Sequence, residues 1–293
     1  FTKVEVVNAG DGADQVNTDG ADASLFAELG NAVDYALETL AITFRDTENA
    51  DLNGGTLAGS AEADSFEVTG AALTANEIIV TNAASAIDAG TGNDAVTVND
   101  ANSALTGTNN ELDTANYQFT SIESADLTSK ALTGTAGVDT FDVTGANALT
   151  SAGINFSNVE VVNADDGVDQ VNTDGADASL FAELGSAVDY ALETLGITFR
   201  ETENADLNGG TLAGSSEADS FAVTGTTLTA NAISVTNAAS AIDAGTGDDA
   251  VTVNDANSAL TGTDNELDTA NYEFSSVETV DLADNALTGT ANA

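Results

Sequence analysis

The sequence contains no cysteine, histidine, methionine, tryptophan or proline, and only four of its 293 residues are lysine or arginine. Without cysteine there is no disulfide, thiolate metal ligand or thiol nucleophile. Without histidine there is no imidazole for acid–base catalysis or for most zinc, iron and copper sites. The absence of proline suits stacked strands, because each strand can then donate backbone hydrogen bonds to neighbours on both sides.

Positive charge is almost absent, and this excludes further partners. Lys3, Arg45, Lys130 and Arg200 stand against 49 acidic residues, which gives a formal net charge of −45. Nucleic-acid binding needs many basic residues to neutralise phosphates, and an anionic membrane surface would repel the chain, so we expect neither partner. No stretch approaches 18 consecutive apolar residues, so we expect no membrane insertion by a helix.

Such a charge is typical of disordered chains only when hydrophobic content is low. Here 42% of the residues are hydrophobic, and the valine, isoleucine, leucine and phenylalanine residues recur at regular spacing. We therefore expect a folded chain. Its fold has to accommodate the mutual repulsion of many carboxylates.

The sequence is a tandem duplication. Residues 4–9 return as residues 159–164, an offset of 155, and about 113 of the 138 overlapping pairs are identical. We expect one continuous solenoid over residues 1–293, with a first repeat at 1–155 and an incomplete second repeat at 156–293. Both ends fall inside a repeat, so we expect the chain to be a window of a longer array, with any secretion signal outside it.

Within each repeat, short strands are predicted at intervals of 36 to 43 residues. A first apolar-x-apolar signal is followed by a second alternating strand that begins with aspartate, as in Asp64-x-Phe66-x-Val68. Pieces this short cannot bury a core alone, but they can when stacked coil on coil. The pattern predicts an all-β chain, a parallel β-solenoid of β-roll or β-helix type. The first signals lie at residues 42–44, 78–80, 117–119, 154–156, 197–199, 233–235 and 272–274.

One segment in each repeat departs from this pattern. Residues 22–40 and 177–195 place apolar residues at helical spacing behind a candidate N-cap at Asp22 or Ser24. We predict a short helix there, interrupted at Gly30, once per 155-residue repeat. The segment either packs against the side of the solenoid or forms a lateral contact between neighbouring chains.

Two glycine-rich turns are candidate cation sites. Residues 89–96 and 244–251 contain the pattern G-x-G-[ND]-D-x-apolar, in which glycines open a tight turn and carbonyl and carboxylate oxygens face a cation. Calcium suits such a turn, because it takes about six to eight oxygen ligands in flexible geometry. The predicted calcium-binding residues of these turns are Asp88, Gly90, Gly92, Asn93, Asp94, Asp243, Gly245, Gly247, Asp248 and Asp249.

Weaker versions of the turn occur elsewhere. A looser one at residues 134–141 keeps a glycine and the aspartate. The alternative for every turn is a solvated loop that holds no metal, since glycine and aspartate are common turn residues. An EF-hand is disfavoured, because no glutamate falls at the twelfth loop position. A partial version at residues 11–16 and 166–171 has the predicted ligands Asp11, Asp14, Asp166 and Asp169.

Residues 90–94, 132–141 and 156–163 resemble the RTX-related repeats of bacterial surface-layer proteins and giant adhesins. The resemblance covers most of the chain through motifs of low complexity. It implies secretion in an unfolded, calcium-free state, followed by calcium-driven folding into a parallel β-roll outside the cell. The nonapeptide tandems of that family are missing here, so we expect a few calcium sites rather than dense rows.

Two other functions are compatible with a β-solenoid but less favoured. Polysaccharide-degrading enzymes of this architecture generally need a basic residue, whereas Asn158 and Asn285 replace Lys3 and Lys130 in the second repeat, so we predict no enzyme. An ice-binding module would need a regular outward row of threonines, but positions equivalent to Thr97 carry Glu, Asp, Asn or Ala in other modules. A polysaccharide-binding module stays open as a further alternative.

The sequence therefore predicts a secreted structural protein, a calcium-stabilised repeat rod that is part of a bacterial surface layer, an extracellular fibre or an adhesin stalk. The expected location is extracellular, at the cell surface. The expected partners are identical chains, associated end to end or laterally, and cell-surface polysaccharide. Aspartates stacked along the turns would repel one another unless cations enter, so the charge is expected to delay folding until calcium is present.

Overall fold

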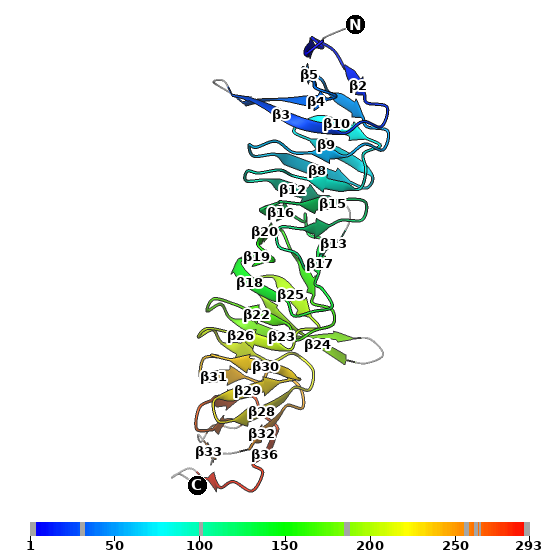
Figure 1. Cartoon of the computed structure of the whole chain (residues 1–293). Helices are drawn as coiled ribbons and strands as arrows, with labels where there is room; N and C mark the ends of the chain where they lie inside the picture. The colour runs from blue at the N-terminus through cyan, green and yellow to red at the C-terminus, as the bar shows by residue number, and fades with distance from the viewer. Residues whose placement is uncertain are drawn as a thin grey trace. The chain divides into compact units, whose positions relative to one another are not determined.

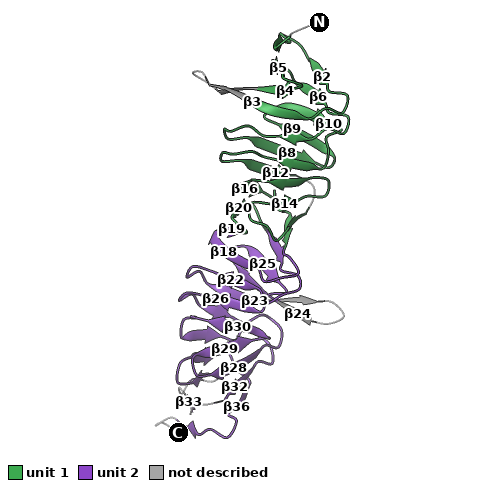
Figure 2. Cartoon of the chain, viewed as in Figure 1, with its two compact units in different colours: residues 1–133, 151–159 green, residues 134–150, 160–293 purple. Residues whose placement is uncertain are grey.

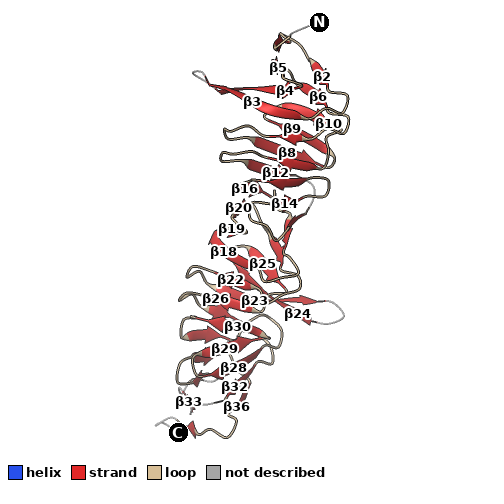
Figure 3. Ribbon diagram, viewed as in Figure 1, coloured by secondary structure: helices blue, strands red, loops and turns tan. Residues whose placement is uncertain are grey.

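The computed structural model describes residues 4–29, 33–99, 102–184, 188–254, 258–260, 263 and 265–289. The described residues form strands and no helix, and the predicted fold class, an all-β parallel β-solenoid, is confirmed (Figure 1, Figure 3). The chain divides into unit 1, residues 1–133 and 151–159, and unit 2, residues 134–150 and 160–293 (Figure 2). One continuous solenoid over residues 1–293 stays a prediction.

Unit 1 is built from two sheets. The first contains, in hydrogen-bonded order, β1 (Val6–Asn8), β5 (Ile42–Arg45), β4 (Val33–Thr39), β3 (Ala23–Leu29), β7 (Leu57–Ala58), β11 (Ala86–Asp88), β15 (Gln118–Thr120), β14 (Leu112–Asp113), β13 (Ser103–Leu105) and β17 (Ala131–Thr133). The second contains β2 (Gln15–Asn17), β6 (Asn49–Asp51), β10 (Ile78–Thr81), β9 (Ala72–Ala75), β8 (Ser65–Thr69), β12 (Ala95–Val98), β16 (Ser124–Asp126) and β20 (Ile154–Ser157).

Unit 2 repeats this plan. Its first sheet contains β21 (Val161–Asn163), β25 (Ile197–Arg200), β24 (Val188–Thr194), β23 (Ala178–Leu184), β27 (Leu212–Ala213), β31 (Ala241–Asp243), β35 (Glu273–Ser275), β34 (Leu267–Asp268), β33 (Ser258–Leu260) and β37 (Leu287–Thr288). Its second contains β19 (Ala148–Ser151), β18 (Thr140–Gly145), β22 (Gln170–Asn172), β26 (Asn204–Asp206), β30 (Ile233–Thr236), β29 (Thr227–Ala230), β28 (Ser220–Thr224), β32 (Ala250–Val253) and β36 (Thr279–Asp281).

The chain alternates between the two sheets, and antiparallel three-stranded meanders interrupt the parallel ladders. In unit 1 the meanders are β3–β4–β5 and β13–β14–β15 in the first sheet and β8–β9–β10 in the second. The predicted signals at residues 42–44 and 78–80 fall in the last strand of their meanders, and the signal at 117–119 begins one residue before β15. Each module of the short period therefore adds one meander, and successive meanders change sheet.

The helix predicted over residues 22–40 and 177–195 is wrong. Strands β3 and β4 pair antiparallel, as do β23 and β24. Leu25 lies opposite Leu37, and both are buried, so the apolar spacing also satisfies a two-residue alternation. The base of each hairpin pairs with neighbouring strands, and this tertiary pairing outweighs a weak helical preference. Gly30, the expected interruption, lies outside the described residues.

The core lies between the two sheets. In unit 1 the ring of Phe66 on β8 lies 5.5 Å from that of Phe119 on β15, centroid to centroid. In unit 2 the corresponding pair, Phe221 and Phe274, lies at 5.6 Å. Each such side chain contributes about 2–3 kcal/mol through burial. The inward residues of the predicted alternation thus hold the coils together, which leaves the turns free for other roles.

Candidate metal centres

Acidic residues that precede strands of the second sheet stack from coil to coil. In unit 1 the backbone N–H of Asp64 donates to Oδ1 of Asp94 at 2.8 Å. The backbone N–H of Asp94 in turn donates to Oε2 of Glu123, also at 2.8 Å. We call such a set a carboxylate stack. Its spacing follows from the parallel register of β8, β12 and β16, which places these residues one above another.

Unit 2 contains two further carboxylate stacks with the same bonds at 2.8–2.9 Å. A shorter version occurs in unit 1, where the N–H of Asp14 donates to Oε2 of Glu48 at 2.8 Å. The two stacks of unit 2 consist of Asp139, Asp169 and Glu203, and of Asp219, Asp249 and Glu278.

The first carboxylate of each stack is satisfied by its own turn. Oδ2 of Asp64 accepts hydrogen bonds from the backbone N–H of Ser60 at 2.6 Å and from its hydroxyl at 3.0 Å. Oδ1 of Asp64 accepts from the side-chain amide of Asn76. Ser215 and Thr135 serve Asp219 and Asp139 in the same way. These aspartates are therefore structural acceptors that need no cation.

The central carboxylate of each stack has a buried oxygen without a partner. The side chains of Asp94, Asp169 and Asp249 are 0% exposed. In all three, Oδ2 has no hydrogen-bond partner, and the same holds for the partly buried Asp14. Leaving such an atom unpaired costs on the order of 1–3 kcal/mol, and more when it is charged. The position therefore offers a cation a buried carboxylate oxygen that has no other partner.

Burial also perturbs the protonation of the central aspartates. Desolvation raises the pKa of Asp94 to about 6, although the N–H of Asp64 works in the opposite direction. The nearby negative charges of Asp64 and Glu123 raise the pKa further. Burial likewise raises the pKa values of Asp169 and Asp249. At pH 7 Asp94 is mostly ionised, and no hydrogen bond to its Oδ2 offsets that buried charge.

The glycines of the predicted turns are explained by close stacking of neighbouring turns. Gly90 has a φ of +97°, and a Cβ atom there would lie 2.2 Å from the carbonyl oxygen of Ser60. A Cβ atom at Gly92 would lie 2.5 Å from the carbonyl oxygen of Glu62. Gly245 and Gly247 meet their neighbours in the same way. Main-chain oxygens of the adjacent coil thus lie beside the turn that ends in the buried carboxylate.

The predicted ligands fall into two groups. Asp14, Asp94, Asp169 and Asp249 carry the unpartnered oxygen, whereas Asn93 and Asp248 are exposed. The upstream acids Asp11, Asp88, Asp166 and Asp243 are exposed as well, and Oδ1 of Asp88 and of Asp243 accepts a backbone N–H from Gly90 and Gly245.

Within the described ranges, no three acidic side chains lie close enough to hold a metal ion. A cation at a central carboxylate would therefore have at most two acidic side chains as ligands, and its other ligands would have to be neutral oxygens. The donor set contains only oxygen, which fits calcium.

The acidic stack partners were not among the predicted ligands. Glu123 precedes β16 in the same register in which Asp94 precedes β12, with an acid two residues before an inward side chain. The signal that could have found them is this acid-x-apolar spacing, which does not require glycine. The missed stack partners are Glu48, Asp64, Glu123, Asp139, Glu203, Asp219 and Glu278.

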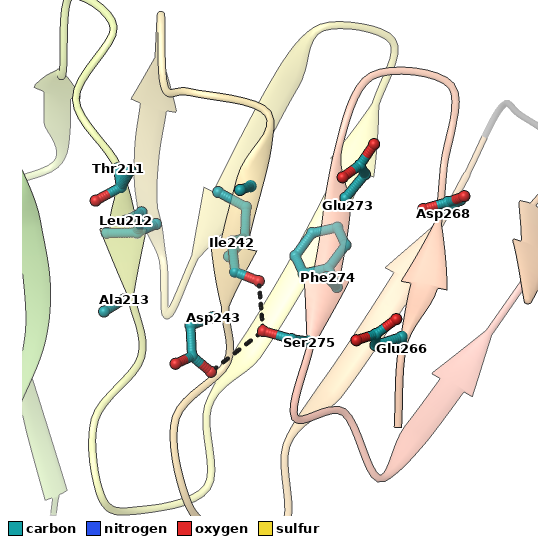
Figure 4. Close-up of a pocket in the computed structure, with 11 residues that line it drawn as sticks. Thr211, Leu212, Ala213, Ile242, Asp243, Glu266, Asp268, Glu273, Phe274 and Ser275 are labelled. Carbon is teal, nitrogen blue, oxygen red and sulfur yellow. Dashed lines mark hydrogen bonds between the residues drawn. The ribbon is translucent and has the colours of Figure 1, made fainter. Parts of the chain in front are cut away.

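Unit 2 also has a surface pocket of about 470 Å³ beside β31 and β35 (Figure 4). Its wall includes Ser275, whose hydroxyl lies 3.4 Å from Oδ1 of Asp243. Every charged residue of the lining is acidic, so the pocket disfavours anionic ligands, and it does not include the buried Asp249. The acidic lining residues are Asp243, Glu266, Asp268 and Glu273.

Comparisons with protein-family models, with curated proteins and with solved structures found no match to this chain. The β-solenoid agrees with the fold that the resemblance to RTX-related repeats implies, but no comparison adds support for that family. In the part of the chain that the structure describes, no helix has the length and apolar character to cross a membrane.

Proposed function

We propose that this chain is a secreted structural protein, a calcium-stabilised repeat rod of a bacterial surface layer, an extracellular fibre or an adhesin stalk. The observation that supports the proposal is the unpartnered, buried Oδ2 atom at Asp14, Asp94, Asp169 and Asp249. These are the positions at which the aspartate-ending turn patterns predict a ligand. The aspartates of the turn patterns are thus the ones with an unpartnered, buried oxygen. A bound cation explains this coincidence better than a solvated turn does.

In this proposal, Asp94, Asp169 and Asp249 each supply a carboxylate oxygen to one calcium ion. Carbonyl oxygens of the same turn and of the adjacent turn supply further ligands, and Asp14 forms a weaker site because it is only partly buried. Bound calcium supplies positive charge beside the stack and offsets the repulsion among its carboxylates. Sites with few carboxylates bind calcium at about 10⁻⁴–10⁻³ M, the range of extracellular modules.

A structural role suits the repetition of the chain. The two units share most of their strands and turns, and the stack of Asp64, Asp94 and Glu123 recurs as Asp219, Asp249 and Glu278. Near-identical copies offer the same surfaces repeatedly rather than one unique site. A solenoid adds stability by contacts between neighbouring coils, so that its length can grow without a new fold. We accordingly propose no enzymatic activity, and an extracellular location in which calcium is available.

The test is thermal unfolding followed by circular dichroism, in excess chelator, in about 10 mM calcium and in about 10 mM magnesium. Calcium should raise the melting temperature, because a ligand at about 100 times its dissociation constant stabilises the folded state by about 2.7 kcal/mol per site. Magnesium should do less, because it binds poorly to flexible carbonyl-rich sites. Equal melting temperatures in all three solutions would contradict calcium binding.

A further inference from the structure

Two hairpins leave the stacked coils and carry free strand edges. Strand β3 pairs with β7 only through Ala23 and Ser24, and β4 pairs with β5 only through residues 37–39. Beyond these contacts, residues 25–29 have no strand neighbour except β4 among the described residues. Figure 1 shows β3 and β4 extending away from the rest of unit 1, and β24 from the rest of unit 2.

The free part of β3 has little protection against pairing. Natural edge strands are blunted by charged side chains, especially lysine, by proline or by bulges; residues 22–40 contain neither lysine nor proline, and residues 25–29 carry a single charge, Glu28. Phe26 and Phe181, at equivalent places in the two hairpins, are 38% and 39% exposed. The 19 residues of this segment are identical in the two repeats except at one position, where Asn31 corresponds to Ser186. The same exposed edge is thus offered twice by each chain.

We propose that these hairpins pair edge to edge with the hairpins of a second copy of this chain, through β3 and β23, and join chains laterally. The inference rests on the proposed structural function, because it names the contact by which such chains associate. Antiparallel pairing of β3 with its own copy, centred on Ala27, sets Phe26 opposite Glu28 and Leu25 opposite Leu29. Between the two copies of β3 no acidic residue then opposes another, although Glu28 lies opposite Asp34 within each hairpin, and the pairing forms a closed two-fold contact.

The charge of the chain determines when this contact can form. Two chains of formal charge −45 repel each other strongly at low ionic strength. The free part of β3, five residues at about 3.4 Å each, extends about 17 Å, which is about twice the Debye length at 0.15 M salt. Paired tips therefore hold the main bodies beyond the range of most repulsion. Association should therefore strengthen as salt is added.

The experiment is sedimentation velocity of the full chain in saturating calcium, at about 0.01, 0.15 and 0.5 M NaCl. The wild type should form larger species as salt and protein concentration rise. The double variant F26E/F181E places a charge at the pairing edge and should weaken association at least tenfold. The matched control, I79E/V280E, adds the same charge at side chains that are 49% and 41% exposed outside the hairpins, and should associate like the wild type.

A cysteine variant reports the register, because the natural chain has no cysteine. On oxidation, Ala27→Cys should give disulfide-linked dimers, whereas Ile79→Cys should not. A wild type that stays monomeric would overturn the inference. This holds also if the hairpins bind a lysine-rich peptide, which would indicate a basic partner in place of a second copy. Equal weakening by F26E/F181E and I79E/V280E would overturn it too. Far-UV circular dichroism checks that each variant folds, and a calcium-dependent melt that persists without association would leave the proposed function intact while refuting this contact.

Discussion

Two turns of unit 1, residues 59–64 and 89–94, stack on each other and end in aspartates of the same register, yet the two aspartates differ. Asp64 is held by the hydroxyl and amide of Ser60, whereas Oδ2 of Asp94 has no partner. The place of Ser60 is taken by Gly90 in the second turn, and a Cβ atom there would meet the carbonyl oxygen of Ser60 itself. The stacking that requires glycine therefore also removes the hydroxyl that would satisfy the second carboxylate.

The same contrast recurs in unit 2. Ser215 holds Asp219, while Gly245 occupies the equivalent place in the turn that ends at Asp249. A Cβ atom at Gly245 would lie 2.3 Å from the carbonyl oxygen of Ser215. Each repeat thus stacks a turn whose aspartate is hydrogen-bonded by its own serine, the self-sufficient turn, on a turn whose buried aspartate has no such partner, the unbalanced turn. Substitutions in either turn can test this difference.

The largest effect is expected from Gly59→Ala, which separates the two turns. A Cβ atom at Gly59 would lie 1.7 Å from the carbonyl oxygen of Ala89, so a whole coil has to shift. We expect a loss of at least about 3 kcal/mol of unfolding free energy, at the upper end of overpacking effects. Gly54→Ala is the matched control: its φ of +95° costs about 1 kcal/mol, but nothing lies within 4 Å. Chemical denaturation in calcium measures both, and equal losses would argue against close stacking.

The dependence of stability on pH tests the unbalanced turns, those that end in Asp94, Asp169 and Asp249. Burial raises the pKa of Asp94 from 3.8 to about 6, so the folded state holds that proton more tightly than the unfolded state. In chelator, stability should therefore be highest near pH 4 and fall as pH rises to about 6, by on the order of 2–3 kcal/mol for Asp94. Asp169 and Asp249 act in the same direction. Denaturation between pH 4.5 and 8 checks this, and stability that rises across this range would refute it.

The self-sufficient turn should respond to loss of its carboxylate. In Asp64→Asn, an amide replaces one of two oxygens that both accept hydrogen bonds, so a donor faces a donor. We expect a loss of about 2 kcal/mol in calcium, typical of hydrogen bonds to charged groups. In chelator the loss should be smaller, because removing the charge of Asp64 also relieves its repulsion of Asp94. Thermal melts of the single variant measure the loss. An unchanged melting temperature would mean that Ser60 does not hold this side chain.

The smallest effect is expected from Asp165→Gly. Asp165 adopts a φ of +72°, and the first repeat has glycine at the equivalent position, Gly10. Relief of the left-handed conformation should stabilise the chain by about 1 kcal/mol. The charge of Asp165 also raises the pKa of Asp169, so its removal adds to the gain. The reverse change, Gly10→Asp, should destabilise, and a gain in both variants would contradict the argument.

The strands and the repeat could be predicted from the sequence because two-residue alternation is a local signal. Phe66 and Val68, for example, are inward on β8 as the alternation requires. The meanders could not be predicted, since an antiparallel return depends on which neighbouring strand is available. The hairpin β3–β4 shows this most clearly. Its apolar residues fit both a helix and a strand, and only pairing with β5 and β7 decides between them.

Only the local part of the candidate site could be predicted from the sequence. Sequence spacing identifies the aspartate at the end of each turn, such as Asp94 and Asp249, because it lies next to an inward strand residue. It does not reveal that Glu123 lies one coil away, since that contact is separated by 29 residues and depends on sheet register. Nor does it show that the glycines serve close stacking of turns rather than an open loop.

The most direct test is the triple variant D94N/D169N/D249N, compared with the wild type in chelator and in calcium. Asparagine keeps an oxygen that can accept the N–H of Asp64 and removes the buried charge. In chelator at pH 8 the variant should melt at a higher temperature than the wild type. Calcium should raise the melting temperature of the wild type much more than that of the variant, which keeps only the weaker site at Asp14. A variant that melts lower than the wild type in chelator, or that keeps the full calcium shift, would contradict cation binding at the central carboxylates.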